Sequence, residues 1–121
     1  MNLFDSSAPL AYLRAEPGRD RVREQLVEGG RVSAANWAEV AAKSQTVGPS
    51  LLQARALILS WGLSVEPVLE LDAELAARLW RRGSGLSLGD RLCLATAERL
   101  DATVCTADSA WGTSGRIRQI R

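Results

Sequence analysis

Short apolar runs alternate with segments of helical periodicity along the chain. Short segments typical of β-strands are residues 2–5, 31–33, 63–68 and 103–106, together with residues 115–120, in which polar and apolar residues alternate. Strands separated by helices pair in parallel through right-handed crossovers, with helices packed on the sheet. The pattern therefore predicts the α/β class: a single three-layer α/β/α domain over residues 1–121, with a small, mainly parallel central sheet.

The segments between these runs have apolar residues every three or four positions and predict six helices. They lie between residues 6 and 16, at 19–28, from 33 to about 47, and at 51–61, 72–82 and 88–100. Ser6 or Ser7, Ser33 and Ser87 stand before helices, where a Ser side chain accepts hydrogen bonds from unpaired backbone N–H groups. Gly48-Pro49-Ser50 is predicted to break the chain, because Gly and Pro favour turns.

The composition excludes several kinds of chemistry. The 121 residues are 46% hydrophobic and 24% charged, which suits a globular domain that buries its own core. There is no His, so His-based triads and typical zinc sites with His ligands are excluded. Cys93 and Cys105 lack CxxC spacing and are expected to be reduced core residues. No apolar run reaches the ~18 residues of a membrane span and no signal pattern is present, so a soluble, cytoplasmic protein is expected.

Four acidic residues stand at the ends of predicted strands or near the starts of predicted helices. Asp5 ends the first strand, Asp108 follows the strand at 103–106, and Glu39 and Asp90 lie near the starts of two helices. These junctions share the carboxyl edge of a parallel sheet, where ligands bind in such folds. The four acids are therefore expected to converge, provided that the strand at 2–5 is central.

Convergent carboxylates raise one another's pKa, and a hard divalent cation relieves that repulsion. Oxygen-only ligands favour Mg²⁺ or Mn²⁺. A water acidified by such a cation can attack a phosphodiester. Ser7 and Thr106 are candidates to orient a carboxylate or a metal-bound water.

Each acid also has a purely structural interpretation. Asp5 could be a helix cap, Asp90 stands three residues after Ser87 in the pattern of a capping box, and Asp108 could form an Asx-turn or a cap. Glu39 could be a solvated helix residue. These interpretations do not explain why acids recur at one edge of the sheet.

The basic residues are almost all Arg. The net charge of the whole protein, +1, does not by itself favour binding to nucleic acid. Arg81 and Arg82 precede a Gly-rich loop and are candidates for contacts to RNA phosphates, with a solvated helix end as the alternative.

Four motifs together resemble the PIN-domain family, and most of all the VapC-type ribonuclease toxins of bacterial toxin–antitoxin modules. They are Asp5–Gly18, Val32–Val40, Leu86–Ala95 and Ala102–Trp111, in family order and with family-like spacing. One departure is Pro9, where aliphatic residues are usual; it affects helix geometry and not the chemistry.

The resemblance implies that the four acids are metal-ligating or catalytic, and we assign the metal to Asp5, Asp90 and Asp108, with Glu39 as the fourth catalytic acid. It also implies Mg²⁺ or Mn²⁺, endonucleolytic cleavage of RNA, a homodimer and a cognate antitoxin that blocks the site. The expected function is therefore a metal-dependent endoribonuclease toxin.

Three alternatives stay open. One is a housekeeping RNA-processing PIN nuclease, and another is a catalytically silent protein-binding domain. The third is a phosphoacceptor signalling domain, which needs a Lys opposite its acids. Lys43 is the only Lys and lies in mid-helix, which counts against that alternative.

Overall fold

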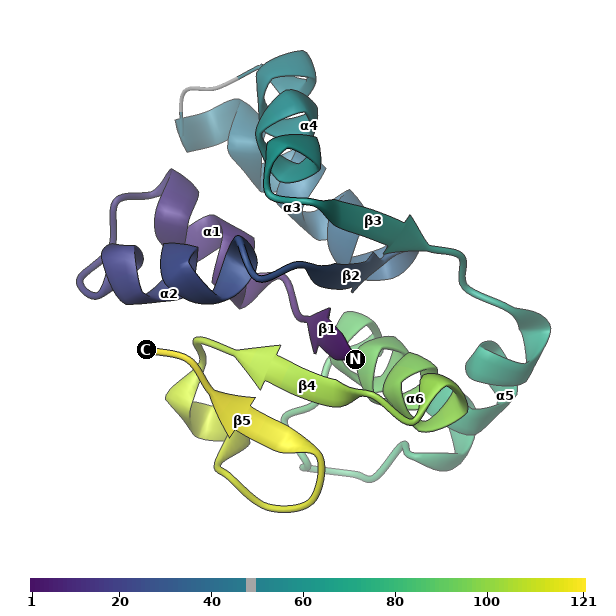
Figure 1. Cartoon of the computed structure of the whole chain (residues 1–121). Helices are drawn as coiled ribbons and strands as arrows, with labels where there is room; N and C mark the ends of the chain where they lie inside the picture. The colour runs from purple at the N-terminus through teal and green to yellow at the C-terminus, as the bar shows by residue number, and fades with distance from the viewer. Residues whose placement is uncertain (48–49) are drawn as a thin grey trace.

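Five short strands form one parallel sheet in the computed structural model, which describes residues 1–47 and 50–121 (Figure 1). The strands are β1 (Asn2–Phe4), β2 (Gly30–Ser33), β3 (Leu63–Glu66), β4 (Thr103–Thr106) and β5 (Ile117–Gln119), and their order is β3-β2-β1-β4-β5. In the register, Phe4 lies beside Val32 on one side and Cys105 on the other. The first strand is therefore central, as the convergence of the acids requires.

Helices cover both faces of this sheet, which confirms the three-layer α/β/α prediction (Figure 1). They are α1 (Ser7–Leu13), α2 (Arg19–Leu26), α3 (Ala34–Val47), α4 (Leu51–Ser60), α5 (Glu70–Arg78) and α6 (Leu88–Leu100), with a short 3₁₀ helix, η1 (Ser109–Trp111). Neighbouring side chains of a strand point to opposite faces. Phe4 accordingly packs in the larger core with α1 to α4, and Leu3 packs in the smaller core with α6.

Several predicted boundaries need correction. The helix predicted at 72–82 is α5, Glu70–Arg78, because the Asp72 carboxylate accepts a hydrogen bond from the Leu69 backbone N–H at 2.9 Å and fixes an earlier start. The strand predicted at 63–68 ends at Glu66, just before Pro67, which has no N–H to donate. Neither Ser6 nor Ser7 caps α1 through its side chain: Ser6 makes no such bond, and Ser7 contacts Asp5 instead.

Other predictions are confirmed. Ser33 accepts a hydrogen bond from the Asn36 N–H at the start of α3 (3.1 Å), and Cys93 and Cys105 are buried and free. The predicted break at Gly48-Pro49 lies outside the described residues. Within the described ranges, each helix is too short or too polar to serve as a membrane-spanning segment.

Candidate active site at the carboxyl edge of the sheet

A cavity of about 480 Å³ lies where β1 and β4 end, and all four acids selected from the sequence line it. Asp5 directly follows β1, Glu39 lies on α3, Asp90 on α6, and Asp108 follows β4. Ser7 also lines the cavity. Residues up to about a hundred positions apart thus share one site because the parallel strands all end at the same edge.

Asp5 is held rigidly by two hydroxyl groups. Ser7 Oγ donates to Asp5 Oδ1 at 2.6 Å, and Thr106 Oγ1 donates to Asp5 Oδ2 at 2.7 Å. Each hydroxyl also accepts a backbone N–H, from Ala107 for Ser7 (2.9 Å) and from Asp108 for Thr106 (3.0 Å). With their own partners fixed, Ser7 and Thr106 hold the orientation of the Asp5 carboxylate.

The Asp5 carboxyl is buried, with 3% of the residue exposed. Burial raises its pKa from 3.8 to about 6, although hydrogen bonds from Ser7, Thr106 and the Ala8 backbone favour the ionised form, and the charge of Asp90 raises the pKa further. The site therefore contains a carboxylate whose charge is costly, and a bound cation would stabilise it.

Two residues that hold Glu39 were not predicted from the sequence. Asn36 is buried, receives a hydrogen bond from Ser33 Oγ at 3.0 Å, and donates through Nδ2 to Glu39 Oε1 at 2.9 Å. Gly89 leaves room for that carboxylate, because a Cβ atom there would overlap Glu39 Oε1. Two features of the sequence could have indicated these contacts. Asn36 lies three residues before Glu39 on the same helix face, and Gly89 lies in a first helical turn, where Gly is unfavourable.

Asp90 and Asp108 both cap helices, as their structural interpretations predict, and they also line the cavity. Asp90 Oδ2 accepts from the Ser87 N–H at 3.0 Å and Ser87 Oγ accepts from the Asp90 N–H at 3.1 Å, which completes a capping box. Asp108 Oδ1 accepts from the Ala110 N–H at 2.9 Å and caps η1. In both side chains one oxygen fixes the orientation, which leaves the other for a ligand.

The donor set suits a hydrated divalent cation. No three acidic, Cys or His side chains within the described ranges stand close enough to form a ready-made cation-binding group. Like-charged carboxylates repel one another, and Mg²⁺ keeps several water ligands. Oxygen donors spread around a cavity therefore fit such an ion, and the metal roles of Asp5, Asp90 and Asp108 stay a prediction.

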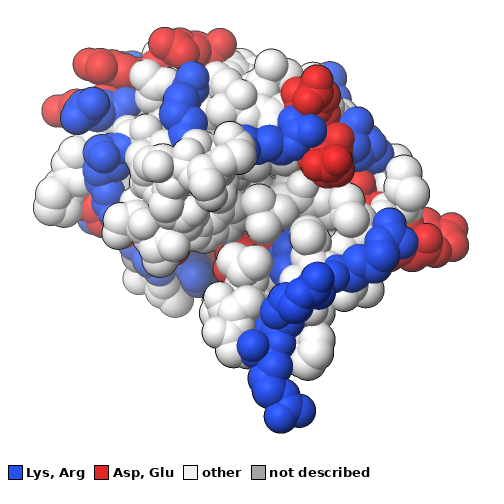
Figure 2. Space-filling view, turned by 90° about the horizontal axis from the view of Figure 1, so that it is seen from below, with Lys and Arg blue, Asp and Glu red and all other residues white. Residues whose placement is uncertain are grey.

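Arg81 and Arg82 do not belong to this cavity. Both are exposed and lie beyond the end of α5, and Arg81 Nη1 donates to the carbonyls of Arg78 and Trp80, both at 2.8 Å. Figure 2 shows that Lys and Arg side chains form an elongated strip on one face of the molecule. A contact of Arg81 and Arg82 with RNA phosphates, as predicted from the sequence, would therefore lie outside the cavity that the four acids line.

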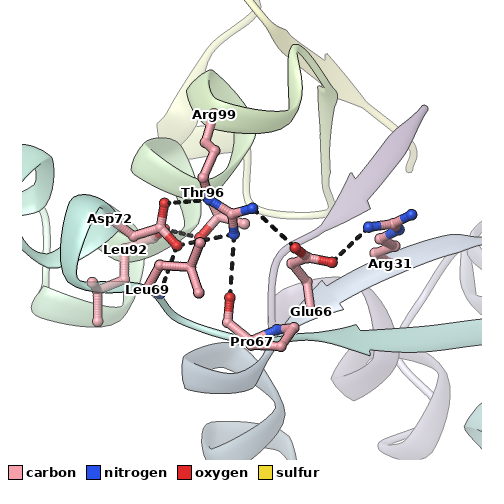
Figure 3. Close-up of polar contacts among 8 residues, drawn as sticks. All are labelled: Arg31, Glu66, Pro67, Leu69, Asp72, Leu92, Thr96 and Arg99. Carbon is pink, nitrogen blue, oxygen red and sulfur yellow. Dashed lines mark hydrogen bonds and ion pairs between the residues drawn. The ribbon is translucent and has the colours of Figure 1, made fainter.

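The helix that carries Asp90 is anchored by a chain of ion pairs (Figure 3). Arg99 of α6 binds both oxygens of Asp72, at 2.8 and 3.0 Å, and reaches Glu66 Oε1 at 3.1 Å. Glu66 in turn accepts from Arg31 at 2.6 Å. The chain joins β2, β3, α5 and α6, and so fixes α6 against the sheet.

The model of a family described as PIN domain matches residues 3–113. A search of curated proteins found no match.

Solved structures share the fold. A toxin–antitoxin complex from Klebsiella pneumoniae has a TM-score of 0.76 at 18% identity, covering 100% of this chain and 98% of that chain. VapC20 from Mycobacterium tuberculosis, described as a toxin that cleaves the sarcin–ricin loop, has a TM-score of 0.72 at 18% identity over 93% and 95% of the two chains. FitAcB from Neisseria gonorrhoeae has a TM-score of 0.67 at 22% identity over 100% and 97%.

Proposed function

The chain belongs to the PIN domain family, and we propose that it is a divalent-metal-dependent endoribonuclease. The observation that carries the proposal is the set of four acids, Asp5, Glu39, Asp90 and Asp108, around one cavity at the carboxyl edge of the sheet. We assign a catalytic role to all four, and we assign Mg²⁺ or Mn²⁺ to Asp5, Asp90 and Asp108.

The cation, when bound, supplies an acidified water and neutralises charge on the phosphate. The protein holds the acidic side chains in fixed orientations. Asp5 is fixed by Ser7 and Thr106, so it offers a rigid ligand. Glu39 is held through Oε1 by Asn36, and its other oxygen is available to accept a proton from a water in the cavity.

The biological role proposed is that of a toxin, and the similar structures support it. One of them is a toxin–antitoxin complex, and another is a toxin described as cleaving an RNA loop. We therefore propose RNA as the substrate, a cognate antitoxin that blocks the cavity, a homodimer, and action in the cytoplasm. Growth arrest on expression, relieved by a co-expressed neighbouring gene product, would separate this role from that of a housekeeping nuclease.

The direct test is cleavage of RNA by the purified protein. We expect internal cuts with Mg²⁺ or Mn²⁺, no cuts in excess chelator, and recovery when the metal is restored, because the proposed cation would acidify the attacking water and neutralise charge on the phosphate. Labelled RNA resolved on a denaturing gel measures this. Undiminished cleavage in chelator would contradict the metal requirement, and no cleavage of any RNA with either metal would contradict the nuclease assignment.

A second prediction concerns Gly89. Gly89→Ala is expected to lower the cleavage rate by about ten- to a hundredfold, because the new methyl group displaces the Glu39 carboxylate. The same change is expected to stabilise α6 by up to about 1 kcal/mol, since Ala favours a helix more than Gly does. Initial rates and urea unfolding measure the two effects.

The control for this explanation is a double variant. In a Glu39→Gln background, Gly89→Ala is expected to cause no further loss of rate, because both changes act on the same group. Additive losses, or a fold destabilised by Gly89→Ala alone, would contradict the steric explanation.

A further inference from the structure

The cavity that holds the acids also has basic residues on its wall. Arg14, Lys43 and Arg121 line it; Arg14 directly follows α1, and Lys43 lies on α3 one turn after Glu39. Lys43 lies in mid-helix, as the sequence predicts, and α3 also brings it to the same cavity as the acids. Membership of the PIN family, and not the position of Lys43, is what counts against a signalling domain.

The three basic residues differ in whether they are already engaged. Arg121 donates through Nη1 to Glu16 at 2.5 Å and through Nη2 to the Ala107 carbonyl at 3.0 Å. Arg14 and Lys43 are exposed and take part in no ion pair within the described part of the chain. Glu39, the nearest acid to Lys43 along α3, is bound by Asn36 instead. The positively charged side chains of Arg14 and Lys43 are therefore free to bind a ligand at the cavity.

The cavity is lined by more acidic than basic residues, so an anionic ligand can bind there only where positive groups offset the carboxylates. Among the described residues that line it, five are acidic and three are basic. A cation held by the acids neutralises charge only where it binds, so phosphates of an RNA backbone next to the bound one still face the other carboxylates. Arg14 offers a planar fork for two phosphate oxygens and Lys43 offers a compact positive charge. Both match the phosphates of a polynucleotide.

We propose that Arg14 and Lys43 form a phosphate-binding subsite, which holds the RNA phosphates adjacent to the one that is cleaved. The proposal rests on the nuclease function proposed above and names the part of its substrate that this wall of the cavity binds. Arg14 and Lys43 contact the RNA backbone and do not act on the reacting bond. Their removal is therefore expected to raise KM more than it lowers kcat.

The test measures binding separately from cleavage. Short single-stranded RNA is titrated into protein carrying Asp5→Asn, without metal, over a series of salt concentrations. Arg14→Ala and Lys43→Ala together are expected to weaken binding by about thirtyfold at low salt. They are also expected to lower the slope of log affinity against log salt by about 1.4, because each lost phosphate contact removes roughly 0.7. Lys43→Arg is expected to keep most of the affinity.

Arg21→Ala combined with Arg23→Ala is the matched control, because it also removes two positive charges, at exposed positions of α2 outside this cavity. This control is expected to leave affinity and salt slope almost unchanged. An equal loss with the control would show that only net charge matters and would overturn the subsite. Unchanged binding by the double variant would also overturn it, even if the wild type cleaves RNA. A wild type that binds RNA through Arg14 and Lys43 without cleaving it would refute the nuclease and leave the subsite standing.

Discussion

Asp5→Asn is expected to lower RNA cleavage by on the order of a thousandfold. The amide keeps the shape of the side chain but removes the negative charge that the proposed cation needs. Ser7 and Thr106 hold this side chain through both of its oxygens. Initial rates with Mg²⁺ measure the loss.

The same substitution is expected to make the metal-free protein more stable at neutral pH. The pKa of Asp5 is about 6 in the folded protein, against an ordinary value of 3.8, so the folded state binds more protons than the unfolded state between these values. The free energy of unfolding therefore falls as the pH rises through this window and stays lower above it. The pKa difference corresponds to about 3 kcal/mol, at roughly 1.4 kcal/mol for each unit of pKa. About 1 kcal/mol of this gain is lost again, because the amide nitrogen cannot accept the hydroxyl hydrogen bond that one carboxylate oxygen accepts.

Urea unfolding in chelator between pH 4 and pH 8 checks this second effect. The wild type is expected to lose stability across the window, whereas Asp5→Asn does not. Added Mg²⁺ is expected to restore stability to the wild type at pH 7 and not to the variant. Asp20→Asn, at an exposed position of α2, is the control and should leave cleavage unchanged. A fully active Asp5→Asn protein would exclude Asp5 from the catalytic site.

The positions of the four acids followed from local patterns and one topological rule. Apolar runs predicted β1 and β4, and the acids after them had to lie at the carboxyl edge once the strands were parallel. Ser87 and Asp90 predicted the start of α6 correctly, because a capping box is a contact between residues three positions apart. Local chemistry sufficed for this contact, because its two partners are close in sequence.

Contacts between distant segments could not be predicted in this way. The pair of Asp72 with Arg99 joins residues that lie 27 positions apart in the chain. Arg14 and Lys43 meet at one cavity only because α1 and α3 converge on it. The periodicity of the sequence does not predict these contacts, since each depends on how the helices pack.

Asp72→Ala is expected to destabilise the fold by about 3 kcal/mol. Only 1% of the Asp72 side chain is exposed, and its loss leaves the Arg99 guanidinium without its bidentate partner in a partly buried place. It also removes the hydrogen bond that caps the Leu69 N–H. Although burial raises the pKa of Asp72, the bonds from Arg99 and Leu69 outweigh it and hold the pKa below 3.8. The stability from Asp72 is therefore present above pH 3.8 and lost at lower pH, opposite in sign to the effect of Asp5.

A double variant separates the ion pair from the helix cap. Combining Asp72→Leu with Arg99→Met is expected to recover much of the stability, because apolar residues of similar size often replace a buried ion pair at little cost. Glu98→Ala is the control, since Glu98 pairs with Arg116 while 64% of its side chain is exposed, and it should change urea unfolding little. If Asp72→Ala unfolds at the same urea concentration as the wild type, this ion-pair chain does not hold α6. Loss of cleavage by folded Asp72→Ala would instead show that the chain also positions Asp90, which lies at the other end of that helix.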